Sequence, residues 1–251
     1  LYEDVNMNHE GEIKYFDTGL GISQNLTVAD KYSVSSKLVE YVRTTLTDDA
    51  PSFSRFYTFS ASSSGNYINW NGNFREGYSY GAIIDESLNV DPGVRTVNNF
   101  REHFSFTIFK LFGNWFNPSF RITVNHQTNN AGNGYIFGTY GSVGGEVRGV
   151  LNNRISDNNV FALVTNMNIL TVFPMPKLFD FADYYASVFF DYALVKQNSG
   201  SDFESFYGFG VEGVGIFKEY PSYPIRLSIG FDLERFRKWL NEEGPSNFYE
   251  I

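Results

Sequence analysis

The segment from Tyr223 to Glu234 carries an apolar side chain at every second position without a break. Its odd positions are Tyr, Ile, Leu and Phe, whereas Arg226, Ser228 and Asp232 stand among its even positions. A period of two predicts a β-strand with one apolar and one polar face. Such a strand is typical of outer-membrane barrels, whose polar lumen lies opposite the lipid-facing side. We therefore expect the odd positions to face lipid and the even positions to face a lumen.

The same alternation recurs through the chain. The clearest hairpin is predicted by Phe104 to Ile108 with Phe120 to Val124, and the segment from Phe161 to Ile169 sets Asn166 and Asn168 opposite an apolar face. Asparagines would be costly against an apolar core, but a wet lumen accepts them. Further strands are expected within residues 12–22, 31–46, 53–61, 67–84, 184–194 and 207–212.

Polar and turn-forming stretches separate these strands. Residues 1–10 are polar and turn-like, and the residues Asn71-Gly72-Asn73 favour a tight hairpin because Asn and Gly tolerate positive φ. The segment from Asp85 to Asn99 is expected to be a loop. Other turns or loops are expected at 48–51, 127–134, 152–159, 174–176 and 198–200. About twelve strands are visible, each near the roughly ten residues needed to cross a bilayer obliquely, and the number rises to sixteen if short strands are missed.

Composition supports an all-β chain. Aromatic residues make up 18% of the sequence and there are 23 Gly but only 3 Met, which favours strands and turns over helices. We expect residues 1–251 to form a single antiparallel transmembrane β-barrel domain. The tail at 235–251 is expected to be a short helix or loop, or the beginning of a further strand.

Several classes of function are disfavoured by what the sequence contains. The net charge of -9 repels a polyanion, so no nucleic-acid partner is expected. The sequence has no Cys and 3 His, and we expect neither a metal site nor a cofactor. It lacks the apolar run of roughly 18 residues that a membrane-spanning helix requires. An export signal is expected to have been removed or to lie outside this sequence, because Leu1 is not followed by a basic and then an apolar segment.

One arginine stands between glycines in the segment Gly144-Gly145-Glu146-Val147-Arg148-Gly149. About forty residues later, the segment 189–193 reads Phe-Phe-Asp-Tyr-Ala, within a stretch whose even positions from Tyr184 to Leu194 are apolar. This parity turns Asp191 to the opposite face, where Arg148 can reach it.

These two pieces resemble the signature pair of the BamA/TamA-type outer-membrane assembly barrels, the bacterial surface antigen family. The resemblance covers residues from about Gly134 to Glu234 and implies that Val147, Arg148 and Gly149 form an inturned loop. It implies that Arg148 pairs with Asp191 on a strand that also carries Phe189, and that this pair pins the loop to the lumen wall. Val150 replaces the family's usual aromatic residue, and Ala193 its usual glycine.

The resemblance also implies a location and an activity. A barrel of this family lies in the bacterial outer membrane, has sixteen strands, and inserts or translocates other proteins. The expected partners are therefore the lipid bilayer, other envelope proteins and client polypeptides, and the chain is not expected to be an enzyme. A passive pore or a structural barrel within an envelope complex is the alternative, although the predicted lumen faces are rich in Gly, Ser and Asn with scattered charge.

A second resemblance concerns the segment Asn125-His126-Gln127-Thr128-Asn129, which is similar to the His-x-Ser-Asn segment of outer-membrane phospholipase A. It implies His126 as the base and Thr128 in the nucleophile's position. The branched threonine hinders attack, and the orienting residue of that family has no counterpart in the sequence, so we expect neither residue to be catalytic. A soluble β-sandwich is a further alternative, and it would place four polar residues on exposed outer faces: Asn166, Asn168, Asp191 and Glu212.

Overall fold

The computed structural model describes residues 2–7, 13–29, 31–45, 52–89, 98–128, 146–150, 154–155, 159–173, 181–197, 199–219 and 225–240. In this part of the chain nearly all regular structure is strand, and the all-β prediction is confirmed. The strands are β1 (Tyr2–Met7), β2 (Ile13–Val28), β3 (Tyr32–Thr45), β4 (Ser52–Asn66), β5 (Asn69–Asn71), β6 (Phe74–Asn89), β7 (Asn98–Phe109), β8 (Phe116–Gln127), β9 (Phe161–Val172), β10 (Ala182–Lys196), β11 (Glu204–Phe217) and β12 (Ile225–Asp232), followed by helix α1 (Leu233–Lys238).

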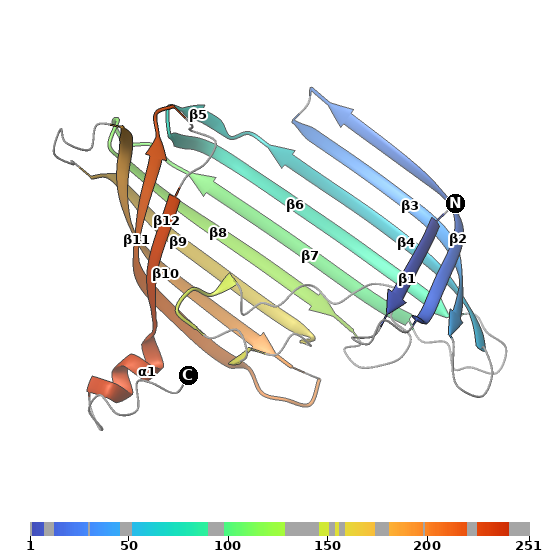
Figure 1. Ribbon diagram of the computed structural model, residues 1–251. Coiled ribbons are helices and arrows are strands. Elements are labelled where there is room, and N and C mark those ends of the chain that lie inside the picture. The colour runs from blue at the N-terminus through green and yellow to red at the C-terminus, as the bar shows by residue number, and fades with distance from the viewer. Residues whose placement is uncertain are drawn as a thin grey trace. The chain divides into compact units, whose positions relative to one another are not determined.

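The strands form one antiparallel sheet in which neighbours along the chain are neighbours in space (Figure 1). Its order is β1-β2-β3-β4-β6-β7-β8-β9-β10-β11-β12, and the short strand β5 pairs with β6. Consecutive strands of this path pair antiparallel with each other, which gives an up-and-down order. The structure thus establishes a single antiparallel sheet, and closure of this sheet into a barrel stays a prediction.

The chain divides into two compact units, which are described separately. Unit 1 takes its residues from the ranges 1–66, 81–104 and 125–139. Unit 2 takes its residues from the ranges 67–80, 105–124 and 140–251. Strands β6, β7 and β8 contribute residues to both, while β9 to β12 and α1 belong to unit 2.

Two segments expected to be turns or loops contain strand residues, so those expectations were wrong in part, whereas residues 8–10 and 90–97 lie outside the described residues. Residues 1–10 contain β1, whose backbone pairs antiparallel with β2 with an irregularity at Met7. The expected loop from Asp85 begins as the last residues of β6, and Asn98 already belongs to β7. The sequence hid the end of β6 because Asp85 is a buried charge: Arg101 Nε donates a hydrogen bond to its Oδ2 at 3.0 Å, and Ser60 Oγ donates to its Oδ1.

The hairpin expected around Gly72 is present, with φ of +60° at that glycine between β5 and β6. The hairpin of β7 and β8 contains the two alternating runs that predicted it. Residue 200 lies in the turn expected there. The turns expected at 48–51 and 174–176, and residues 129–134 and 241–251, lie outside the described residues.

In unit 2 the two faces of the sheet differ sharply. Along β10 the odd positions from Tyr185 to Val195, among them Asp191, are buried, whereas Val188 and Phe190 are exposed. We call the side of Asp191 the cavity face and the side of Val188 the outer face. Exposed apolar side chains of unit 2 outside β10 include Ile108, Phe120, Met167, Tyr207, Val211, Ile225, Leu227 and Ile229.

Unit 1 has a similar division. Val39 is buried on β3, and Phe56 and Thr58, which lie two residues apart, are buried on the neighbouring strand β4. Leu38 and Phe59, which are cross-strand partners on the same pair of strands, are exposed. On β2 the exposed apolar residues are Leu20, Ile22, Leu26 and Val28.

Helix α1 begins at Leu233, within the segment that the sequence assigned to the strand. Asp232 ends β12 and caps the helix, because its Oδ1 accepts hydrogen bonds from the backbone N–H groups of Glu234 and Arg235 at 2.9 and 3.2 Å. The helix packs through Phe236, whose ring centroid lies 5.5 Å from that of Phe209. In the described part of the chain, no helix has the length and apolar character needed to span a membrane.

Candidate functional site

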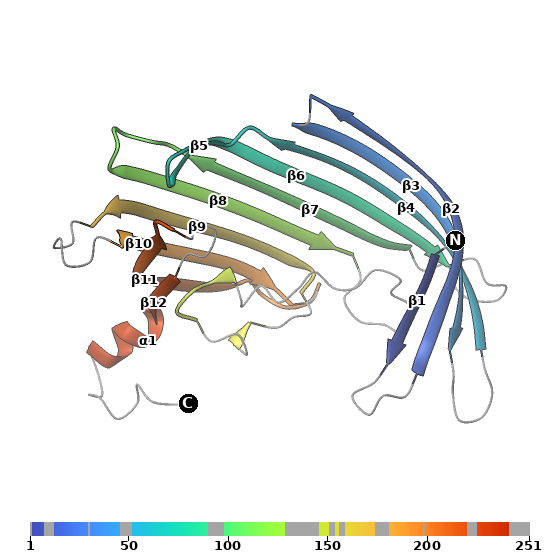
Figure 2. The same ribbon diagram turned by 45° about the horizontal axis from the view of Figure 1, so that its top comes forward.

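The segments 146–150 and 154–155, which we call the arginine loop, lie against strands β9 to β12 in both ribbon views (Figures 1 and 2). Arg148 Nε donates to Asp191 Oδ2 at 2.8 Å, and its Nη2 donates to Asp191 Oδ1 at 2.7 Å. The backbone N–H of Arg148 donates to the same carboxylate at 2.9 Å. The Asp191 side chain is 0% exposed. The structure therefore brings together the two residues that the sequence paired, in a bidentate and buried contact.

Two further residues fix the guanidinium of Arg148. Asn168 Oδ1 on β9 accepts a hydrogen bond from Arg148 Nη1 at 2.6 Å. The guanidinium carbon lies 3.9 Å from the ring centroid of Phe189, so the cation stacks on an aromatic face. Asn166 holds the loop from its other side, since its amide donates to the carbonyl of Glu146 at 2.7 Å. Asn166 and Asn168, from which the sequence predicted a wet lumen, are thus both hydrogen-bonded to the arginine loop.

Two glycines of the cavity face make room for the loop. A Cβ at Gly208 on β11 would lie 1.9 Å from the carbonyl oxygen of Arg148, and a Cβ at Gly230 on β12 would lie 2.9 Å from Gly149 Cα. A Cβ at Gly210 would instead lie 2.1 Å from the carbonyl oxygen of Ile229 on β12 and 2.6 Å from the ring of Phe189. The loop therefore contacts bare backbone on two strands. The alternation of glycines on β11 was visible in the sequence, but the close approach that requires them was not.

Gly149 itself must be a glycine for two reasons. Its φ is +88°, a left-handed conformation that residues with a Cβ rarely adopt. A Cβ there would also lie 2.5 Å from the backbone nitrogen of Phe231 on β12. The tight fit at Gly149 explains why a glycine directly follows the arginine.

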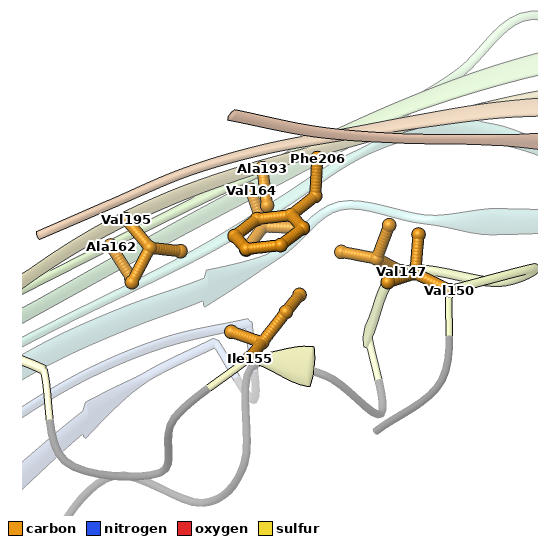
Figure 3. Close-up of a cluster of buried hydrophobic side chains, with 8 residues drawn as sticks. All are labelled: Val147, Val150, Ile155, Ala162, Val164, Ala193, Val195 and Phe206. Atoms are coloured by element: carbon orange, nitrogen blue, oxygen red, sulfur yellow. The ribbon is translucent and has the colours of Figure 1, made fainter. Parts of the chain in front are cut away.

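The arginine loop also contributes three side chains to a cluster of buried apolar residues. Figure 3 shows Val147, Val150 and Ile155 pointing toward Phe206 of β11. Ala193 is 0% exposed within this cluster, and Val150 is 5% exposed. Both residues are thus part of the apolar core of unit 2. The remaining members are Ala162, Val164 and Val195.

A second arginine anchors the far end of the loop. Arg154 forms an ion pair with Asp232, the last residue of β12, and its Nη2 lies 3.6 Å from Glu234 Oε2 on α1. A hydrogen bond from Lys238 lowers the pKa of the Glu234 carboxyl, and the positive charges of Lys238 and Arg154 act in the same direction. The sequence analysis did not find this pair. The only sign of it in the sequence was Asp232, an acidic residue at an even position of the last predicted strand.

Next to the loop, unit 2 contains a cavity of about 950 Å³ on the cavity face. Arg75, Arg121 and Arg226 line it together with Glu146 and Glu212. Arg121 Nη2 lies 3.7 Å from Glu146 Oε2, and Arg226 Nη1 lies 3.4 Å from Glu212 Oε1. The sequence predicted charges scattered over the lumen faces, whereas the structure places these five charged side chains around one cavity.

His126 and Thr128 lie in unit 1, at the end of β8. His126 Nδ1 lies 3.1 Å from Glu102 Oε2, and both side chains are substantially exposed. Thr128 Oγ1 accepts a hydrogen bond from the backbone N–H of Phe100 at 3.1 Å, which continues the β7–β8 pairing. Each side chain therefore has a partner on β7, and neither contact activates the threonine hydroxyl.

We expect Thr128→Ala to leave phospholipase activity unchanged, because the hydroxyl accepts a backbone hydrogen bond rather than donating one to His126. The measurement is release of fatty acid from mixed micelles in the presence of calcium, with the wild-type protein and the variant at equal concentration. A calcium-dependent activity that Thr128→Ala abolishes would contradict this prediction and favour the phospholipase alternative.

No group of three or more His, Cys, Asp or Glu side chains that could hold a metal ion occurs among the residues that the structure describes. Comparison with protein-family models and with curated proteins finds no match to this chain.

Proposed function

We propose that this chain is a β-barrel of the bacterial outer membrane that inserts or translocates other proteins, with the arginine loop held inside the barrel. The observation that carries the proposal is the buried contact of Arg148 with Asp191, made by a loop whose Val-Arg-Gly sequence resembles that of the assembly barrels. Partners would be the bilayer, other envelope proteins and client polypeptides.

The outer faces of both units support membrane insertion. Leu227 is 73% exposed and Ile229 is 54% exposed in unit 2, and Leu20 and Ile22 are each 74% exposed in unit 1. A water-soluble protein rarely exposes contiguous apolar surface on this scale, whereas lipid contact removes it from water. Closure of the sheet would also remove its two end strands from solvent.

The direct test is reconstitution. The purified chain in liposomes should accelerate the folding of a urea-unfolded outer-membrane barrel, measured as the heat-modifiable band on a gel. Arg148→Ala should reduce the rate to that of protein-free liposomes, because the loop loses its anchor on β10. Arg55→Ala, which removes an exposed ion pair with Glu40, is the control and should retain the activity. Wild-type protein that does not accelerate client folding would refute the proposal.

A passive pore is the second candidate, and the cavity favours it specifically. Charges of both signs, including Arg226 and Glu212, line a single space, as they do in the constrictions of pores. Planar-bilayer recordings separate the candidates: stable open conductance without client folding would indicate a pore.

The orientation of β12 in the membrane gives a separate prediction. Leu227→Arg should destabilise the folded barrel by about 2–4 kcal/mol if the position lies near the midplane, because it places a charge on the lipid-facing side. Ser228→Arg should cost much less, since the Ser228 hydroxyl already donates to Glu212 Oε2 at 3.0 Å on the cavity face. Folding titrations with urea in lipid vesicles measure both costs. Equal costs at the two positions would contradict the assignment of faces.

A further inference from the structure

We propose that the cavity of unit 2 binds a phosphate-bearing anion through Arg75, with Arg226 as a second cation. The inference does not depend on the proposed function, since it concerns only the side chains that surround this cavity. The arginines that line the cavity are not all paired with a carboxylate.

Three of the arginines that line the cavity have carboxylate partners. Arg148 is neutralised by the buried Asp191, Arg121 lies near Glu146, and Arg226 lies near Glu212. Arg75 differs: in the described part of the chain, no carboxylate lies within ion-pair distance of its guanidinium. The cavity therefore carries an uncompensated positive charge, although the chain as a whole has a net charge of -9.

The position of Arg75 is fixed by its neighbours. Its backbone N–H donates to Asn117 Oδ1 at 3.0 Å, and Asn117 Nδ2 donates back to its carbonyl at 2.7 Å. Its guanidinium carbon lies 4.3 Å from the Trp70 ring centroid and 5.2 Å from that of Phe109. Stacking occupies the faces of a guanidinium and leaves its in-plane N–H donors available. The side chain is thus held ready to donate hydrogen bonds into the cavity.

The surroundings favour an oxyanion with more than one negative charge. Arg226 lines the same cavity, and its contact with Glu212 is long, at 3.4 Å, with the arginine side chain 58% exposed. The hydroxyls of Ser105, Thr107 and Ser119 line the space as well, and they can donate to oxygens that a guanidinium does not reach. Planar guanidinium groups together with hydroxyls suit phosphate oxygens. The volume of about 950 Å³ leaves room for a larger molecule that carries the phosphate.

The test is calorimetric titration of the full chain, folded in a nonionic detergent, with inorganic pyrophosphate. We expect saturable binding that Arg75→Gln weakens by about tenfold or more, because charge-assisted hydrogen bonds are lost. Arg226→Gln should weaken it less. The matched control is Arg55→Gln, an exposed arginine of unit 1, which should bind as the wild type does.

A second titration uses dihexanoyl phosphatidic acid at the same ionic strength. Binding of both compounds with the same loss in Arg75→Gln would indicate recognition of the phosphate group itself, and binding of the lipid alone would identify a lipid headgroup as the source. If Arg75→Gln does not fold, as judged by far-UV circular dichroism, Arg226→Gln decides the question, because the Arg226 side chain is 58% exposed and its replacement is expected to leave folding intact. Absence of saturable binding by either compound, or equal binding by the cavity variants and Arg55→Gln, would overturn the proposal.

Discussion

Asp191→Ala should lower the free energy of unfolding by about 3–5 kcal/mol, because it leaves the partly buried guanidinium of Arg148 without its anion. Arg148→Ala should have a comparable effect, since it removes the two hydrogen bonds that the Arg148 side chain donates to a fully buried carboxylate and leaves only the one from the backbone N–H. The double variant should cost clearly less than the sum of the two single variants. Urea titrations of folding in lipid vesicles, followed by tryptophan fluorescence, provide the four free energies.

A second cycle on Arg55 and Glu40 serves as the matched control. These residues form a cross-strand ion pair between β3 and β4, but their side chains are 55% and 38% exposed. Solvent screening should limit their coupling to less than about 1 kcal/mol. Strict additivity for Arg148 and Asp191, or a coupling no larger than that of the exposed pair, would contradict the anchoring role.

Gly208→Ala should undock the arginine loop. The new methyl group would lie 1.9 Å from the carbonyl oxygen of Arg148, and backbone on both sides of this contact leaves no flexible group to move away. The loop would have to lift, and lifting breaks the buried contact between Arg148 and Asp191. The cost should therefore approach that of losing the pair, about 3–5 kcal/mol.

Gly213→Ala on the same strand is the control, because a Cβ at that position would meet no atom within 4 Å. Replacing this strand glycine should change stability by no more than about 1 kcal/mol, and in the stabilising direction. Limited trypsin digestion gives an independent measurement: cleavage after Arg148 should become rapid in Gly208→Ala and remain slow in Gly213→Ala. Equal protection in the two variants would show that the loop tolerates a side chain beneath it.

The alternation of apolar and polar residues predicted on which face of its own strand a side chain lies. On β10 the odd positions from Tyr185 to Val195 are buried and the even positions between them are more exposed, so the parity argument placed Asp191 on the face that meets Arg148. On β12 the same argument placed Ser228 on the side of Glu212 and Leu227 on the outer face. These features follow from a period of two, which a single segment displays in full.

The features that the sequence did not predict depend on contacts between distant segments. The end of β6 was assigned to a loop because Asp85 is satisfied by Arg101 from the next strand. The ion pair of Arg154 with Asp232 joins residues 78 positions apart, and neither has a motif around it. The glycines of β11 alternate visibly, but only the docked loop shows that Gly208 must lack a side chain. The pattern of a strand can be read within its own segment, whereas the docking of a loop depends on residues that are far away in the sequence.

The docking of the arginine loop on four later strands, β9 to β12, has a kinetic consequence. Its partners Asp191, Gly208 and Asp232 lie on β10, β11 and β12, all of which follow the loop in the chain. The loop can therefore reach its final position only after the C-terminal strands have paired, and such long-range contacts form late in folding. A chain that stops before β12 is in place would present an undocked and protease-sensitive loop. Docking of the arginine loop should therefore indicate that the last strand has been added.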